Sequence, residues 1–177
     1  MNTIFPPYIT DIHTHRLDAG PEAIINITPS DNLTPGHHYS IGIHPWEAAT
    51  ATTKLRDRVS LVADNPAVLA IGEAGIDLIH SPVAPIQLQI ELLRWHIDLS
   101  EQLEKPLILH VVRALEHIIQ LKRQINPRQP WIWHGFRGKQ QMADQLLAHG
   151  IHISINPDYP PATPVTIPPH FLHLESD

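Results

Sequence analysis

The sequence contains no cysteine, which excludes disulfides, thiolate metal ligands, iron–sulfur clusters and cysteine nucleophiles. It also has no apolar stretch of membrane-spanning length, and its first residues, MNTIFPPYIT, lack the basic start and apolar run of a signal peptide. We therefore expect a cytoplasmic protein without a membrane partner, in which any metal ion is bound by His, Asp or Glu.

Basic residues are scarce: Lys and Arg number 12 against 18 Asp and Glu, so the formal net charge is −6. This balance argues against a protein whose task is tight, salt-sensitive binding to a nucleic-acid backbone. It leaves room for an enzyme that handles phosphates briefly, because bound divalent cations would invert the local field of an acidic site.

Histidine, in contrast, is abundant, with 14 residues in the chain. Since His is the commonest metal ligand in proteins, this surplus suggests a metal site. Most of the histidines nevertheless follow no ligand spacing, and we expect these to lie at the surface or in ordinary packing. They are His37, His38, His80, His96, His117, His149, His152, His170 and His173.

Eight short runs rich in apolar and β-branched residues recur along the chain. Most are nearly continuous rather than alternating, which is typical of parallel strands buried on both faces. The predicted strands cover residues 8–13, 23–28, 39–44, 68–73, 106–111, 130–135, 151–156 and 171–176.

Several of the segments between these strands carry apolar residues at three- and four-residue steps, which predicts helices. The predicted helices cover residues 53–64, 85–104, 114–125 and 138–149, and Gly150 is expected to end the last of them. Strands that alternate with helices in this way indicate a fold of class α/β, a (β/α)₈ barrel of the TIM type.

A barrel of this kind usually needs about 250 residues, whereas this chain has 177, and we expect residues 1–177 to form one domain. The shortfall lies after strands 1, 2 and 7, because residues 14–22, 29–38 and 157–170 are too short or too rich in Pro and Gly for regular helices. The sequence also stops at Asp177, so no helix follows the eighth strand. We expect an incomplete outer helix ring, with apolar surface for a second copy, as in a homo-oligomer, or for a further C-terminal segment.

The clearest chemical motif is DIHTH at residues 11–15. In a strand, residues two apart point to the same side, so His13 and His15 can converge on one ion. Further side chains of ligand type stand at the carboxyl ends of other predicted strands, where βα enzymes place their functional residues. They are Glu73, His110, His134 and Asp177. Because an ionisable group at the end of a buried strand is costly unless something pairs with it, this repetition predicts one shared site.

The six residues together provide four imidazoles and two carboxylates, enough for two adjacent divalent cations with one carboxylate between them. Such a pair of ions lowers the pKa of a bound water and stabilises the attacking and leaving oxygens of a displacement. Imidazoles favour Zn, Mn, Fe or Ni over Mg, although the sequence leaves the identity of the metal open.

Six motifs, spread over essentially the whole chain, carry a family resemblance. They are DIHTH at 11–15, GIHPWEA at 42–48, AIGEAGID at 70–77, KPLILH at 105–110, WHGF at 133–136 and LESD at 174–177. In this order they resemble the TatD-like deoxyribonucleases, metal-dependent hydrolases of the amidohydrolase type on a TIM barrel. The resemblance implies that the six residues above bind the metals and that the substrate is DNA or a related phosphoester. It also implies that Glu73 bridges the metals and that Asp177 orients the nucleophilic water or takes its proton.

The resemblance assigns roles to the neighbours of these ligands as well. His44 is expected to line the pocket and contact a phosphate, while a structural role in the turn before Pro45 is equally open. Asp77 is expected to support a ligand rather than bind metal. The family usually has an arginine two residues after the fifth-strand histidine, where this chain has Val112. Arg113, one residue later, is the candidate phosphate ligand, but this shift could turn its side chain away.

Three functions are compatible with these residues. The first is a metal-dependent phosphodiesterase or nuclease, and the second is a related enzyme that cleaves an amide, lactone or phosphotriester. The absence of a lysine near the end of the fourth strand, where a carbamylated lysine bridges some related metal pairs, favours the first. The third is a degenerate barrel that binds metal without activity, which the incomplete helix ring keeps open.

Overall fold

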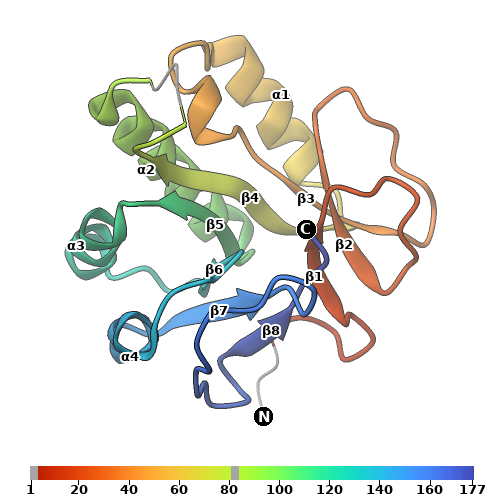
Figure 1. The fold of residues 1–177 in the computed structure, drawn as a ribbon. Helices are drawn as coiled ribbons and strands as arrows, with labels where there is room; N and C mark the ends of the chain where they lie inside the picture. The colour runs from red at the N-terminus through yellow and green to blue at the C-terminus, as the bar shows by residue number, and fades with distance from the viewer. Residues whose placement is uncertain (1–3, 81–83) are drawn as a thin grey trace.

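The computed structural model describes residues 4–80 and 84–177. Its strands form one parallel sheet in which each strand pairs with the next along the chain, as Figure 1 shows. The strands are β1 (Asp11–Thr14), β2 (Ala23–Ile27), β3 (His38–Ile41), β4 (Val68–Asp77), β5 (Leu107–Val112), β6 (Trp131–Trp133), β7 (Ile151–Ile155) and β8 (Leu172–Leu174). All eight predicted strands are therefore present, and the predicted TIM-type barrel is confirmed.

The sheet comes close to closing on itself where the chain segment after β8 meets β1. The backbone N–H of Ser176 donates to the carbonyl of His13 at 3.2 Å. The Ser176 hydroxyl also donates to Asp11 Oδ2 at 2.5 Å. The two ends of the sequence thus meet at the point where the barrel must be joined.

In the described part of the chain, four α-helices lie outside the barrel, each close to its predicted position. They are α1 (Thr53–Ala63), α2 (Ile86–Leu103), α3 (Leu115–Ile125) and α4 (Gln140–Ala148), and a short 3₁₀ turn, η1 (Pro45–Glu47), precedes α1. Local chemistry sets their ends: the Thr52 side chain accepts from the N–H of Leu55 at the start of α1. Gly150, with φ of +65°, follows α4 as expected.

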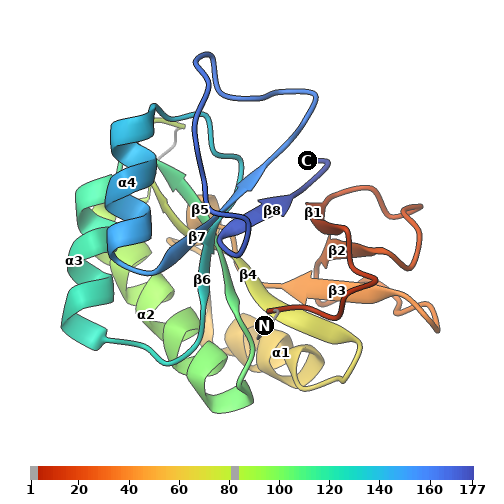
Figure 2. The ribbon, with the colours of Figure 1, turned by 90° about the horizontal axis from the view of Figure 1, so that it is seen from below.

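The helix ring is incomplete, as the sequence predicted. Figures 1 and 2 show α1 to α4 along β3 to β7, whereas β1, β2 and β8 are flanked by loops. Residues 14–22, 29–38 and 157–170 contain no helix. Within the described residues, no helix has both the length and the apolar character that a membrane span requires.

The core has two layers. The larger cluster lies between the strands and the helices and includes Leu93 of α2 and Leu109 of β5. The second cluster joins side chains from five strands and Phe5 inside the base of the barrel. Its strand members are Ile12, Ile24, Ala70, Ile108 and Ile132. The barrel interior is therefore apolar at its base, so the polar side chains gather at the opposite, carboxyl-terminal end.

Candidate metal centre

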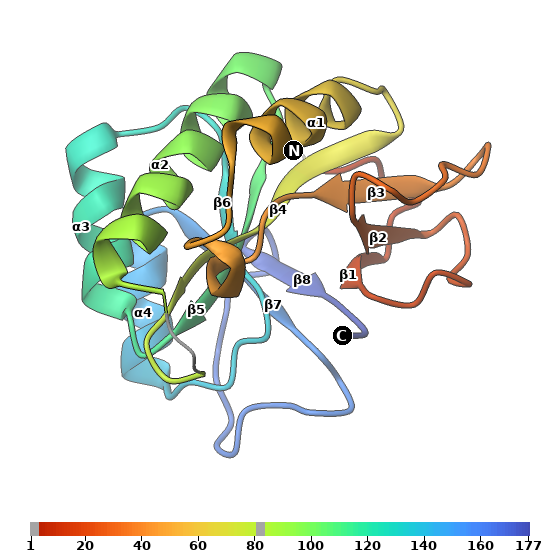
Figure 3. The ribbon, with the colours of Figure 1, turned by 90° about the horizontal axis from the view of Figure 1, so that it is seen from above.

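The six predicted ligands converge at the carboxyl ends of the strands. They come from both sides of the barrel: His13 and His15 from β1 and its end, Glu73 and His110 from β4 and β5, His134 from just after β6, and Asp177 from beyond β8. Figure 3 shows the barrel from the side, with the C-terminus beside β1 and β8. Three overlapping sets within the cluster hold their ligand atoms within 4.8 Å of one another: His13–His15–Asp177, His13–Glu73–His134 and His44–Glu73–His110.

Glu73 lies at the centre of the cluster and is 5% exposed. Its Oε2 is 3.1 Å from His15 Nε2 and 3.7 Å from His13 Nε2. Its Oε1 is 2.7 Å from both His110 Nδ1 and His134 Nε2. Each oxygen therefore faces a different pair of imidazoles, so that one carboxylate lies beside all four predicted histidine ligands.

A slip in strand pairing turns Glu73 into the barrel. Simple alternation places Glu73 on the same side as Ile71, but Ile71 pairs with Leu107 and belongs to the outer, helix-facing core. The pairing of β4 with β5 shifts between Ile71 and Ala74, and this irregularity reverses the side to which the following residue points. The position of Glu73 inside the site thus depends on a local break in the strand's period of two.

Asp177 completes the group on the β1 side. Its Oδ1 is 3.5 Å from His15 Nε2 and 4.0 Å from His13 Nε2. The Asn156 amide donates to the Asp177 carbonyl at 2.5 Å. Ser176, the residue before Asp177, donates its backbone N–H to Asp11 Oδ1 at 3.1 Å. Asp11 belongs to the DIHTH motif, but its role in positioning the last strand was not predicted.

The donor set fits divalent metal ions. His13 is fully buried, yet neither of its ring nitrogens has a hydrogen-bond partner among the described residues, and Nδ1 of the buried His134 lacks one as well. Burying an imidazole without partners is unfavourable, whereas a cation held by His13 and Glu73 would use Nε2 of His13, which lies 3.7 Å from Glu73 Oε2. Imidazoles mixed with carboxylates are typical ligands of Zn, Mn, Fe and Ni.

The electrostatics of the cluster follow from burial and from the central carboxylate. Burial raises the pKa of Glu73, but contacts with His110, His134 and His15 outweigh it and lower that pKa strongly. Burial, reinforced by His134, lowers the pKa of His13, which is therefore neutral and able to bind a metal. Burial also lowers the pKa of His134, but Glu175 and Glu73 on its two sides reverse the effect and raise it.

His44 caps the turn at Pro45 and also lines the pocket, while its contact with a phosphate stays a prediction. Its Nδ1 accepts the Trp46 N–H at 3.3 Å and so caps the 3₁₀ turn. The ring also lies in the pocket, where Nε2 is 3.7 Å from Glu73 Oε1. Because burial lowers the pKa of His44 to about 4, the ring is neutral, and with Nδ1 accepting, its hydrogen sits on Nε2. We therefore interpret His44 as a hydrogen-bond donor at the pocket wall rather than as a metal ligand.

Asp77 lies behind His110, as expected of a group that supports a ligand. Its Oδ2 is 3.1 Å from His110 Nε2 and accepts from Trp46 Nε1 at 2.8 Å. The same oxygen is 2.8 Å from His80 Nδ1. This contact with Nε2 leaves Nδ1 of His110 directed toward Glu73. His80, expected to be an ordinary surface residue, is therefore tied to the site through Asp77.

Glu175 is a buried carboxylate that the sequence reasoning missed. It is 3% exposed, and its Oε2 lies 3.8 Å from His134 Nδ1, too far for a hydrogen bond but close enough for charge attraction. The Gly135 N–H donates to its Oε1 at 2.8 Å, and the Ser154 hydroxyl donates to Oε2. Its signal was present in the sequence: Glu175 belongs to the LESD motif, two residues before Asp177.

Arg113, the predicted phosphate ligand, lies outside the metal-centre cavity. That cavity has a volume of about 420 Å³, and its lining includes five of the six predicted ligands together with His44, Asn26 and Trp46. Arg113 follows β5 with φ of +56° and lines a neighbouring cavity instead. The one-residue shift thus places this side chain beside the metal centre and not in it.

Comparison with known proteins identifies the family of the chain. The family described as "TatD related DNase" matches residues 18–177. The chain belongs to this family. A Mycobacterium tuberculosis protein named an uncharacterized metal-dependent hydrolase TatD is 28% identical over 121 residues, 66% of this chain and 46% of the relative. A protein of Erwinia amylovora named 3′-5′ ssDNA/RNA exonuclease TatD is 32% identical over 120 residues, 64% of this chain and 44% of the relative.

The solved structures support the fold in the same way. A TatD homologue of Escherichia coli K12, YJJV, superposes with a TM-score of 0.65 at 23% identity, over 84% of this chain and 69% of the other. A TatD-family hydrolase of Entamoeba histolytica gives a TM-score of 0.69 at 19% identity, over 86% of this chain and 59% of the other. The chain spans a little under half the length of the two curated relatives above, at 46% and 44%.

Proposed function

We propose that this chain is a divalent-metal-dependent hydrolase that cleaves phosphodiester bonds in single-stranded nucleic acid by means of an activated water. Family membership supports the reaction class, and the printed name of the Erwinia relative, a 3′-5′ ssDNA/RNA exonuclease, suggests the substrate. The observation that carries the proposal is Glu73, whose two oxygens face His13 and His15 on one side and His110 and His134 on the other.

The proposed metal ligands form two groups that share Glu73. His13, His15 and Asp177 would hold one ion, and His110 and His134 the other. We propose two ions per chain, without choosing among Zn, Mn, Mg, Ni and Fe. When bound, such ions polarise a phosphoryl oxygen and lower the pKa of a water molecule.

Three further side chains of the site have separate proposed roles: proton acceptance, contact with a phosphate and support of a ligand. The Asp177 carboxylate, with its side chain 32% exposed, borders the cavity and would accept the proton of the attacking water. His44 presents its Nε2 hydrogen to the same space and would donate it to a phosphate oxygen. Asp77 fixes the ring of His110 from behind, so that Nδ1 stays directed to the centre.

The test begins with metal analysis of protein purified without chelator, for which we expect up to two divalent ions per chain. Activity is then measured with Mg²⁺, Mn²⁺ and Zn²⁺ on single-stranded DNA, on bis(p-nitrophenyl) phosphate and on simple amides. We expect phosphodiester cleavage that Asp177→Asn abolishes while the metal content is largely retained. Cleavage of amides without any phosphodiester cleavage would contradict the proposal, and metal binding without turnover would identify an inactive barrel.

A further inference from the structure

A second cavity adjoins the metal centre at the same end of the barrel. It has a volume of about 700 Å³ and is formed by the segments that follow β5 and β6. Its lining includes Val111, Arg113 and His117 from the first segment, and Gly135 and Arg137 from the second.

The two cavities lie at the carboxyl ends of the same two strands. Val111, which lines the second cavity, follows the ligand His110, and Gly135 follows the ligand His134. Since consecutive Cα atoms are about 3.8 Å apart, the backbone that lines the second cavity lies within a few ångströms of the backbone that carries these ligands. The two strand ends are also joined, because the His134 N–H donates to the Leu109 carbonyl at 3.1 Å. A chain molecule bound over the metals would cross these strand ends to reach the second cavity.

The second cavity is basic in an otherwise acidic protein. Arg113 and Arg137 are both exposed in it, and Glu116 is the one acidic residue among the described residues of its lining. Among the described residues, no carboxylate lies within 4.0 Å of either guanidinium. The metal-centre cavity, by comparison, is lined by Glu47, Glu73 and Asp177. Two free guanidinium groups beside a phosphodiester site are suited to a further phosphate, which they can bind through paired hydrogen bonds.

An exposed aromatic ring lies beside one of these arginines, Arg137. The Arg137 guanidinium lies over the ring of Tyr159 at 5.3 Å from its centroid, and Tyr159 is 60% exposed. Tyr159 belongs to the proline-rich loop after β7. Proteins that hold single-stranded nucleic acid combine a basic groove with aromatic rings on which bases stack. Both components occur here, on two neighbouring loops.

We propose that this second cavity binds the nucleotide next to the scissile bond, with Arg113 and Arg137 on its phosphate and Tyr159 against its base. The inference rests on the proposed phosphodiesterase function and adds to it a preference for oligonucleotides over small phosphodiesters. It also gives Arg113 a phosphate to bind outside the metal-centre cavity.

The test compares two substrates, single-stranded oligothymidylate and bis(p-nitrophenyl) phosphate, in the wild type and in Arg113→Ala, Arg137→Ala and Tyr159→Ala. We expect the ratio of kcat/KM for the oligonucleotide to that for the small diester to fall about tenfold for each arginine. For Tyr159→Ala we expect a fall of about fivefold, because one stacked base is lost. The salt dependence of oligonucleotide cleavage should weaken by a slope of about 0.7 per phosphate contact removed.

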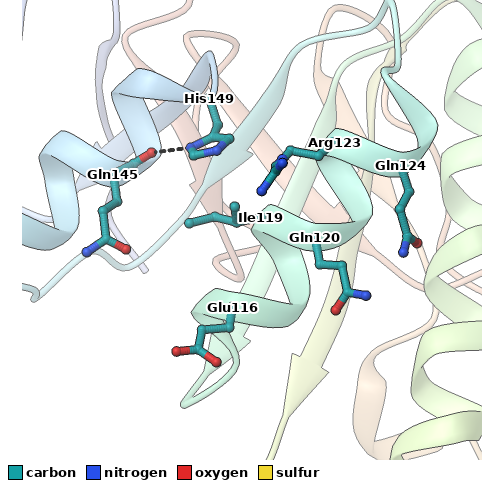
Figure 4. Close-up of a pocket in the computed structure, with 7 residues that line it drawn as sticks. All are labelled: Glu116, Ile119, Gln120, Arg123, Gln124, Gln145 and His149. Atoms are coloured by element: carbon teal, nitrogen blue, oxygen red, sulfur yellow. Dashed lines mark hydrogen bonds between the residues drawn. The ribbon is translucent and has the colours of Figure 1, made fainter.

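The matched control is Arg123→Ala. Arg123 lines a different groove of about 610 Å³ on the outer flank, between α3 and α4, which Figure 4 shows with its other lining residues. This variant removes one positive charge from the same protein without touching the second cavity, and we expect its substrate ratio to equal that of the wild type. Arg137→Lys, which keeps the charge, should lose less than Arg137→Ala, and circular dichroism checks that each variant folds.

Binding gives a second measurement that does not depend on turnover. In the Asp177→Asn background, fluorescence anisotropy of labelled oligothymidylate should show about tenfold weaker binding after either arginine is removed. If the wild type cleaves diesters but the arginine variants keep both the wild-type ratio and the wild-type binding, this inference is wrong and the proposed function stands. If no diester is cleaved but binding still depends on the arginines, the proposed function fails and the second cavity remains a nucleic-acid site.

Discussion

The barrel has two unlike halves, and the proposed metal ligands are divided between them. The helix-covered half, β3 to β7 with α1 to α4, supplies Glu73, His110 and His134. The loop-covered half, β8, β1 and β2, supplies His13, His15 and Asp177. Figure 2 shows this contrast, with helices beside the first group of strands and loops beside the second.

The halves differ in how their outer faces are packed. Leu109 on β5 is 0% exposed beneath the helices, whereas Leu174 on β8 is 48% exposed. The segment after β8 is joined to β1 by hydrogen bonds: Ser176 donates to Asp11 and to the His13 carbonyl. Both halves bury apolar side chains, but the helix-covered half shields β5 completely, whereas β8 leaves Leu174 half-exposed and its junction with β1 depends on hydrogen bonds and, in our proposal, on a shared metal ion.

The largest effect is expected at the residue that joins the halves. Glu73→Gln removes the charge that faces imidazoles on both sides, so we expect loss of metal and a fall in kcat/KM on the order of 10²–10³. Metal analysis and steady-state kinetics check this. The control is Glu91→Gln, at an exposed position on α2, which should leave both unchanged. Full metal content and activity in Glu73→Gln would mean that the halves are not joined through this carboxylate.

The packing difference predicts unequal results from the same truncation. Leu109→Ala leaves a cavity in the buried layer and should lower the free energy of unfolding by about 2–5 kcal/mol. Leu174→Ala removes a half-exposed side chain and should lower it by less than about 1 kcal/mol. Urea unfolding followed by circular dichroism measures both. Equal losses would show that β8 is covered in solution by something that this chain alone does not provide.

Metal removal should affect the loop-covered half more than the helix-covered half. A metal ion present at a hundred times its Kd stabilises the folded state by about 2.7 kcal/mol, and a chelator removes this contribution. We expect hydrogen exchange at β1 and β8 to accelerate on addition of a chelator, while β5 and β6 keep their protection. Uniform acceleration in both halves would instead indicate that the barrel unfolds as one cooperative unit.

Mildly acidic pH should lower the free energy of unfolding by a smaller amount, through a buried histidine in the helix-covered half. His96 of α2 is fully buried, with Nε2 accepting the Ile43 N–H at 2.9 Å, and burial lowers its pKa from 6.5 to about 3. The unfolded chain binds a proton at this residue below pH 6.5 and the folded chain does not, so stability falls as the pH drops from 6.5 toward 3.

Between pH 7 and pH 5.5 this single residue should remove about 1 kcal/mol of stability. In His96→Gln the loss over the same interval should be smaller by that amount, as measured by urea unfolding at each pH. If His96→Gln lost as much stability as the wild type over this pH interval, the acid sensitivity would come from other groups. His152 and His173, whose pKa values burial lowers to about 4, are the next candidates, in β7 and β8.

Much of the fold and most of the site could be predicted from local pattern. Continuous apolar runs identified the eight strands, and three- and four-residue spacing located α1 to α4 to within two residues at each end. Proline and glycine between strands correctly indicated where helices are missing. The proposed ligands were found because each stands at the end of an apolar run, and parallel strands bring such ends together.

Only the tertiary structure decided which way several side chains point. The slip between Ile71 and Ala74 turns Glu73 inward against simple alternation, and the left-handed backbone at Arg113 directs that residue to the second cavity. Glu175 and Asp11 gain their roles from contacts with His134 and Ser176, which are far from them in sequence. The sequence by itself therefore determined which residue types reach the carboxyl end of the barrel. Their partners and orientations were decided by strand register and loop conformation, because these depend on contacts between distant segments that no local pattern encodes.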